Sequence, residues 1–169
     1  MRPKIDPIKG HLTDFLKNVP VYEEQNLDVE NPFYMESRRL EGHATPEGTE
    51  RFYKRAMNEN SYDVLDVSHE NFNSPFDSEV KISSLGYGTY IGDPDDKTDF
   101  DVYDAIKQSV LSGGINHIDT AANYRYMKAE KTVGKILTTL ESKYGVHRDQ
   151  LFVTSKVGYV PEDAENEIS

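Results

Sequence analysis

The sequence predicts an α/β fold built on a parallel sheet and preceded by a largely irregular N-terminal arm. From residue 81 onward, short apolar runs alternate with helical periodicity in the order strand, helix, strand, helix, strand. The connections are long enough to hold a helix, which favours parallel pairing through right-handed crossovers. Before that point, six of the eight prolines interrupt any apolar pattern. We therefore divide the chain into an acidic, partly ordered arm (1–80) and an α/β region (81–169).

One segment of the arm, residues 45–57, is expected to be helical. Thr45 is the expected N-cap and Pro46 takes the first helical position, where a missing N–H costs nothing. Apolar residues then fall on one side of the helix and predict that it docks onto another surface. This stripe consists of Phe52, Tyr53, Ala56 and Met57.

The α/β region divides into five expected elements and an end segment. Strands are expected at 85–90, 115–119 and 151–155. The first helix is expected to begin at Thr98, with Asp101 completing a capping box, and to end at Gly113. The second helix carries apolar residues at spacings of three and four and ends at Gly145. The last residues, 161–169, are expected to form an acidic loop.

Composition and charge exclude several classes of function. A net charge of -11, from 19 Lys and Arg against 30 Asp and Glu, opposes binding to nucleic acid or to an anionic membrane. The chain has no cysteine, which excludes disulfides and thiolate chemistry. It also lacks an apolar stretch of signal-peptide or membrane-spanning length. We expect a soluble, cytoplasmic protein.

Three polar residues fall at or just past the ends of predicted strands, where parallel α/β proteins place their sites. Asp119 ends the second strand, Tyr124 follows in the next loop, and Lys156 follows the third strand. We expect Asp119 to hold Lys156 in a buried ion pair, and the ammonium to make the phenol proton easier to give away. The pattern predicts a site of proton transfer. The alternative for Asp119 alone is a cap of a turn or helix.

Neighbouring residues have simpler interpretations. His117 is expected to be a packed, hydrogen-bonded core histidine, because it lies two residues before the strand end. Tyr126 and Tyr159 are loop tyrosines that either lie on the surface or compete with Tyr124 for the role of acid.

The glycines of LGYGTYIG do not form a dinucleotide-binding fingerprint. The gap between Gly88 and Gly92 is one residue too long, and acidic residues follow that would repel a pyrophosphate. These acidic residues, within 93–96, do not fit a calcium-binding loop either. We expect a solvated loop there.

The strings LGYGTY, HIDTAANY, AEKTVG and TSKVG, in this order, resemble the first three strands of the aldo-keto reductase family over residues 82–160. In the arm, GHATPEGTERFYKRA resembles a segment that precedes the barrel in one group of these enzymes. The resemblance implies a partial (β/α)8 TIM barrel with the first three strands and two helices. It also implies reduction of a small carbonyl substrate, an aldehyde or ketone, with NADPH as the usual cofactor and no metal.

The resemblance assigns roles to the residues already singled out. Tyr124 matches the proton donor of the family, Lys156 the cation that assists it, and Asp119 the carboxylate that holds the lysine. The residues that match the nicotinamide end of the cofactor site are Gly88, Thr89, Tyr90 and Asp119.

The fourth catalytic residue of the family, a histidine after the fourth strand, has no counterpart in this sequence. The late strands that grip the cofactor phosphate are missing too. The resemblance thus implies a truncated portion that binds the cofactor weakly and does not turn over alone. The alternative is a non-enzymatic, degenerate barrel fragment that binds a protein partner, or the missing half of a barrel, through its arm and open sheet edge. The glycine spacing disfavours a flavodoxin-like nucleotide binder.

Overall fold

The computed structural model describes residues 40–58, 67–75, 78–111 and 114–159. All of them belong to one compact unit that spans Phe33–Ser169. No helix within these ranges is long and apolar enough to cross a membrane. The expectations for the first 39 residues, for a helix end at Gly113 and for an acidic loop at 161–169 lie outside the described residues.

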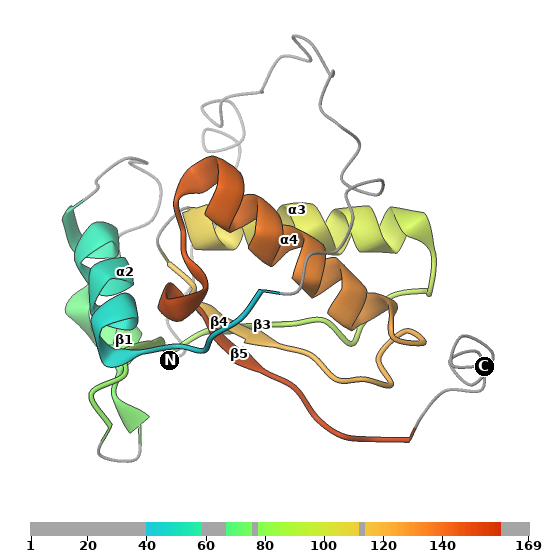
Figure 1. Ribbon diagram of the computed structural model, residues 1–169, viewed down its shortest axis with the longest axis horizontal. Coiled ribbons are helices and arrows are strands. Elements are labelled where there is room, and N and C mark those ends of the chain that lie inside the picture. Colours follow the sequence, from blue (N-terminus) through green and yellow to red (C-terminus); the bar gives the residue numbers. More distant parts are fainter. Residues whose placement is uncertain (1–39, 59–66, 76–77, 112–113, 160–169) are drawn as a thin grey trace, which may run out of the picture. The chain divides into compact units, whose positions relative to one another are not determined.

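Three parallel strands form the central sheet in the order β3-β4-β5 (Figure 1). They are β3 (Gly86–Gly88), β4 (His117–Asp119) and β5 (Phe152–Thr154). A helix lies in each connection between them, so the predicted α/β fold with parallel strands is confirmed. The strands are shorter than predicted, although pairing continues beyond their ends, because the N–H of Thr120 still donates to the carbonyl of Thr154 at 2.9 Å.

The two connecting helices cover one face of the sheet (Figure 1). Helix α3 (Asp96–Leu111) and helix α4 (Lys128–Tyr144) pack against each other there. Strand alternation turns Ile118 toward the helices and Asp119 to the opposite face. Ile118 is fully buried in the hydrophobic core that the two helices share with the sheet. The helices contribute Val102, Tyr103, Ile106, Val110, Val133, Ile136, Leu137 and Leu140 to this core.

Helix α3 begins two residues before Thr98, so the predicted capping box with Asp101 is wrong. Asp95 caps the helix instead, because its carboxylate accepts the N–H of Thr98 at 2.7 Å and its carbonyl accepts the N–H of Asp99 at 3.1 Å. A carboxylate competes well for this position because it also interacts favourably with the helix dipole. The acidic segment 93–96 therefore includes a helix start and is not only a solvated loop.

Helix α2 (Pro46–Asn58) lies where the arm was expected to be helical. Thr45 caps it, since its Oγ1 accepts the N–H of Gly48 at 2.9 Å. Pro46 is the first helical residue, as the sequence indicates.

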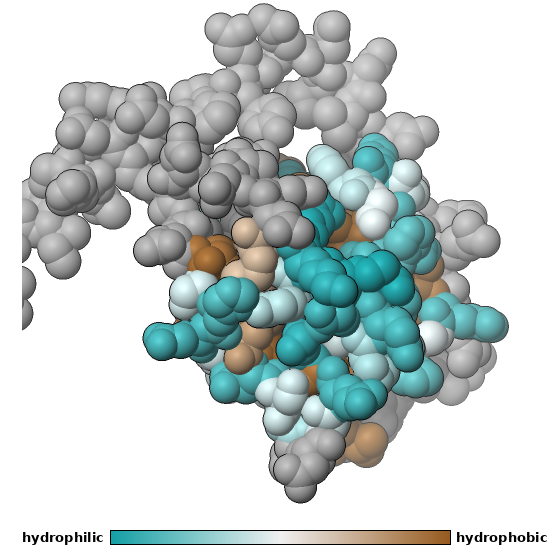
Figure 2. Space-filling view, turned by 90° about the vertical axis from the view of Figure 1, so that its left-hand side faces the viewer, coloured by the Kyte–Doolittle hydropathy of each residue, from teal (hydrophilic) through white to brown (hydrophobic). Residues whose placement is uncertain are grey.

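Helix α2 packs against the segment that leads into β5. That segment is the short 3-10 helix η4 (Arg148–Gln150), whose Asp149 carbonyl accepts the N–H of Thr45 at 3.0 Å. Arg51 adds an ion pair to the Asp149 carboxylate at 2.5 Å, and Phe52 is buried in the hydrophobic core. The side of the molecule that carries α2 is mostly hydrophilic, with only small separated hydrophobic areas (Figure 2).

A single buried amide, Asn116, joins three segments at the amino ends of the strands. Its Oδ1 accepts the N–H of Ser83 at 2.8 Å, while its Nδ2 donates to the carbonyls of Lys81 at 2.9 Å and Gln150 at 3.3 Å. The remaining elements are η2 (His69–Asn71) and the antiparallel pair β1 (Phe72–Asn73) and β2 (Ile82–Ser83). Asn116 therefore links this hairpin to the parallel sheet.

Candidate active site

Asp119 and Lys156 meet at the carboxyl ends of β4 and β5. The Nζ of Lys156 donates to Asp119 Oδ1 at 2.7 Å, to Oδ2 at 2.6 Å and to the carbonyl of Thr120 at 3.1 Å. Thr154 donates its hydroxyl to Asp119 Oδ1 at 2.8 Å. Thr154 lies directly beside Asp119 in the strand register, two residues before Lys156, so all three side chains reach the same face of the sheet.

This ion pair is half exposed, and the expectation of a buried pair is wrong. The side chains of Asp119 and Lys156 are 36% and 49% exposed. The physical reason is their position on the face of the sheet opposite α3 and α4, where these helices do not shield them from water. An exposed pair stabilises the fold only slightly. Its charges are, however, accessible to a ligand.

The pair shifts the pKa of each partner toward the charged form. Burial is the largest single influence on Asp119 and acts to raise its pKa, but hydrogen bonds from Lys156 and Thr154 outweigh it. The pKa of Asp119 therefore lies below its ordinary value of 3.8. The hydrogen bond to Asp119 raises the pKa of Lys156, opposed by desolvation and aided by the hydroxyl of Tyr124. Both groups are charged near neutral pH.

Tyr124 lies against this ammonium group. The Nζ of Lys156 faces the aromatic ring of Tyr124 at 4.9 Å from the ring centroid. On another side, the ring of Tyr90 packs edge-on against Tyr124, with centroids 5.0 Å apart and planes tilted by 66°. The structure thus brings Asp119, Lys156 and Tyr124 together at one edge of the sheet, with Tyr90 beside them.

Gly88 and Thr89, the other two residues expected at the cofactor site on the predicted first strand, differ in the space and the side chain that they present. Gly88 lies beside Asp119 in the register, and a side chain at this position would meet no atom within 4 Å. Thr89 is fully buried, and both its N–H and its hydroxyl donate to the carbonyl of Asp119, at 3.1 and 3.0 Å. Gly88 leaves open space at the site, whereas the side chain of Thr89 is turned into the structure.

The two neighbouring loop tyrosines are largely exposed to solvent. Tyr126 and Tyr159 line an adjacent hollow of about 400 Å³, together with Tyr90 and Arg125. They are 56% and 71% exposed. The cation contact of Lys156 is with Tyr124, which makes Tyr124 the best-placed phenol for proton transfer.

His117 occupies the same face of the sheet as Asp119, one layer deeper. Its ring packs edge-on against Phe152, with centroids 5.4 Å apart, as expected, but the residue is only partly buried, so the expected core position is wrong. The expected hydrogen bonding is not found, because its buried Nε2 has no partner among the residues that the structure describes. Its register neighbours, Gly86 and Phe152, carry no polar side chain that could reach it.

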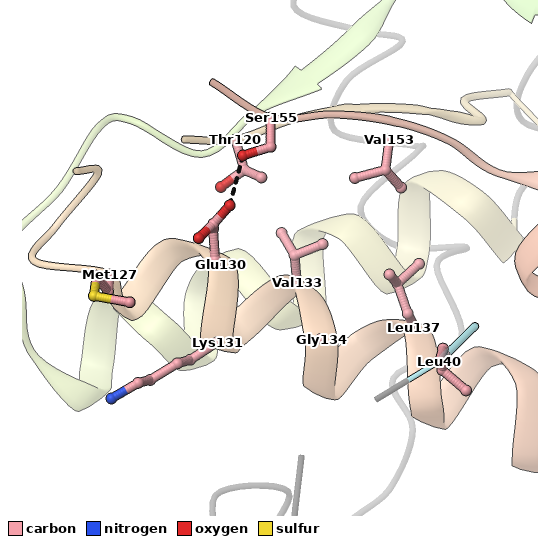
Figure 3. A pocket seen from close by; sticks show the side chains of 10 residues that line it. All are labelled: Leu40, Thr120, Met127, Glu130, Lys131, Val133, Gly134, Leu137, Val153 and Ser155. Carbon is pink, nitrogen blue, oxygen red and sulfur yellow. Dashed lines mark hydrogen bonds between the residues drawn. The ribbon is translucent and has the colours of Figure 1, made fainter. Parts of the chain in front are cut away.

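A second hollow, of about 430 Å³, lies between α4 and the end of β5 (Figure 3). Val133 and Leu137 on the helix face Val153 on the strand, and Ser155 donates to the Glu130 carboxylate at 2.5 Å. The lining also includes Lys131 and Thr120, whose buried hydroxyl has no partner among the described residues, but its walls are mainly apolar, as expected of a packing surface. Within the described ranges, no three His, Cys, Asp or Glu side chains gather as a metal site would require.

Two site residues were not singled out from the sequence. Thr154 holds Asp119, and the signal that could have found it is its place two residues before Lys156 on the same strand. Arg125 follows Tyr124 and pairs with the buried carboxylate of Asp99. No local pattern indicates that pairing, because it depends on how α3 packs.

Comparison with known proteins identifies the family. Residues 84–169 match the sequence profile described as the Aldo/keto reductase family. This segment is just over half of the chain and holds the whole parallel sheet with both of its connecting helices. No curated protein and no solved structure gives a significant match. The resemblance inferred from four short strings is therefore confirmed, and the chain belongs to the aldo/keto reductase family.

Proposed function

We propose that this chain provides the proton-donating site for reduction of a small aldehyde or ketone to an alcohol. The observation that carries the proposal is the continuous line of contacts from Asp119 through Lys156 to Tyr124. Family membership supports an oxidoreductase reaction. The open side of the sheet supports access for a substrate, because the ion pair is half exposed.

Each of the three residues has a distinct role in this proposal. Tyr124 donates its hydroxyl proton to the carbonyl oxygen as that oxygen gains negative charge. The Lys156 ammonium favours release of this proton, because a positive charge stabilises the phenolate left behind. Asp119 holds the ammonium in place with both carboxylate oxygens. Water returns a proton to Tyr124 after the alcohol leaves.

When bound, a nicotinamide cofactor, NADPH in our proposal, supplies the hydride that the carbonyl carbon receives. The fit is supported by Gly88, which leaves the backbone beside Asp119 open to a flat ring. Tyr90 adds an exposed aromatic surface next to Tyr124. We propose that Thr89 acts through its two hydrogen bonds to the Asp119 carbonyl, which keep β3 and β4 in register.

The experiment compares tyrosine variants in a complete barrel that catalyses carbonyl reduction. Residues 84–169 replace the corresponding segment of a family member, because the described parallel sheet has three strands and a full barrel has eight. We expect Tyr124→Phe to lower kcat by at least about 100-fold, with a smaller effect on KM, since the acid acts in the transition state. Tyr126→Phe is the matched control and keeps the parental rate.

Equal rates for Tyr124→Phe and its parent would place the acid elsewhere, and Tyr159→Phe would be examined next. Lys156→Met and Asp119→Asn are expected to lower kcat as well. The chain by itself is tested by titration with NADPH, for which we expect a dissociation constant no tighter than about 1 mM, or about -4 kcal/mol. A micromolar constant would mean that its own residues form a far more complete cofactor site than proposed.

A second candidate is an interaction module without catalysis. Strands β3 and β5 each pair only with β4 among the described strands, which leaves two edges that a further strand or a protein partner can extend. A parental chimera that folds but reduces no carbonyl compound would favour this candidate. A cytoplasmic location remains part of the proposal, since an absence of cysteine is compatible with a reducing compartment.

A further inference from the structure

Arg125 is a buried charge that the proposed chemistry does not use. Its side chain is 2% exposed and pairs with the carboxylate of Asp99, which is 10% exposed, in the first turn of α3. Its Nε also donates to the carbonyl of Thr89 at 3.4 Å. A buried guanidinium is costly unless it is partnered, so its place in the fold depends on these contacts. They join the loop after β4 to the loop after β3 and to α3.

The backbone at Arg125 has an uncommon conformation. Arg125, Tyr126 and Met127 have φ angles of 49°, 55° and 66°, a left-handed region that L side chains rarely adopt. Three such residues in a row persist only where surrounding contacts hold them. This left-handed turn begins directly after Tyr124, so the contacts that hold the turn also set the path of the Tyr124 main chain.

Arg125 and its acceptor Thr89 are the chain neighbours of the two rings at the site. Arg125 is the residue after Tyr124, and its acceptor Thr89 is the residue before Tyr90. The rings of Tyr90 and Tyr124 are in edge contact, 5.0 Å apart. Through its bond to Thr89, the guanidinium forms a clamp that holds the two loops together directly beside Tyr90 and Tyr124.

We propose that Arg125 is the positioning residue of Tyr124. Anchored by Asp99, it holds the left-handed turn and keeps the Tyr124 ring between Tyr90 and the Lys156 ammonium. Its importance for turnover rests on the proposed function, whereas its effect on the position of the ring does not.

The test measures ring contact and turnover in matched variants. Arg125→Met removes the clamp, but Asp99 keeps a cationic partner, since Lys128 Nζ lies 3.7 Å from its other carboxylate oxygen. Asp99→Asn keeps the arginine and removes its anchor. The control is Asp101→Asn, which breaks an exposed ion pair with Lys97 on the same helix.

In the full chain with labelled tyrosines, nuclear Overhauser contacts between the Tyr90 and Tyr124 rings report position directly. We expect these contacts to weaken in Arg125→Met and Asp99→Asn and to stay unchanged in Asp101→Asn. Core methyl signals of Ile106 and Ile136 should stay unchanged in all three variants, which separates positioning from loss of fold. Parental ring contacts in a folded Arg125→Met chain would overturn the proposal. If that variant does not fold, parental contacts in Asp99→Asn overturn it instead.

In the barrel assay, Arg125→Met should lower kcat roughly 10- to 100-fold while KM changes much less, because misplacement of a reacting group affects the transition state most. Combining it with Asp99→Asn should add little, since both variants release the same clamp. Weakened contacts between the Tyr90 and Tyr124 rings, together with an unchanged kcat, would overturn the role of Arg125 in turnover. If Tyr124→Phe also leaves kcat unchanged, the proposed function fails, and the ring contacts still decide whether Arg125 positions Tyr124.

Discussion

Lys156 and Asp119 are 37 residues apart in the chain, yet the lysine Nζ contacts both oxygens of the carboxylate, at 2.7 and 2.6 Å. Replacing the lysine by Met removes the main influence that lowers the pKa of Asp119 and leaves the desolvation that raises it. We expect the titration midpoint of the Asp119 carboxyl carbon, measured by NMR, to lie below 3.8 in the parent and to rise in Lys156→Met. Lys97→Met is the control and should leave this midpoint unchanged.

The two pKa shifts also determine how the contribution of this ion pair to stability depends on pH. Because the folded pKa of Asp119 is lowered, its contribution to stability is present above 3.8 and is lost as pH falls through the lowered value. Because the folded pKa of Lys156 is raised, its contribution is present below 10.5 and is lost as pH rises through the raised value. A midpoint for Asp119 at or above 3.8 in the parent chain would contradict this electrostatic account.

The elements of the α/β region were predictable because local patterns and tertiary packing agree there. The second helix ends at Gly145, where φ is 66° and glycine pays no side-chain penalty, as predicted. The first helix was misplaced because Thr98 and Asp95 both suit an N-cap, and sequence spacing alone does not rank them.

The site was predictable in its residue types and less so in its environment. The ends of parallel strands share one edge, which brings Asp119 and Lys156 together once the strands are identified. Their half exposure depends on whether any element covers the face of the sheet on which they lie, away from α3 and α4, and local sequence does not encode that. The anchor of Arg125 was missed for a similar reason, because Asp99 reaches it only through packing of α3 beside the loop.

Asn116→Ala should strongly destabilise the fold. The variant leaves the N–H of Ser83 and the carbonyls of Lys81 and Gln150 without their partner in the interior. We expect a loss of about 2–4 kcal/mol in the free energy of unfolding, measured with urea. Asn73→Ala, at an exposed residue with one side-chain bond to Ser84, is the control and should cost less than about 1 kcal/mol. Similar losses for both variants would argue against the joining role of Asn116.

Two threonines that were both predicted as N-caps should respond differently to replacement. Thr45→Ala removes the acceptor for the N–H of Gly48 and should lower the free energy of unfolding by about 1 kcal/mol. Thr98→Ala should cost less, because Asp95 caps α3 and the acceptor stays in place. Urea midpoints of the two variants provide the comparison. A larger loss for Thr98→Ala would place the true start of α3 at the position that the sequence first indicated.

Ile118→Ala should strongly destabilise the sheet, because this side chain of β4 is fully buried in the core shared with the two helices. Removing it leaves a cavity as well as losing apolar contact, so we expect a loss of about 2–5 kcal/mol in the free energy of unfolding. Ile91→Ala is the matched control, since Ile91 is 85% exposed and its truncation should change stability by less than about 0.5 kcal/mol. Should Ile118→Ala fail to fold, Ile118→Val offers a milder change of about 0.5–1.5 kcal/mol. A loss near zero for Ile118→Val and Ile118→Ala alike would mean that α3 and α4 do not form the core over this face of the sheet.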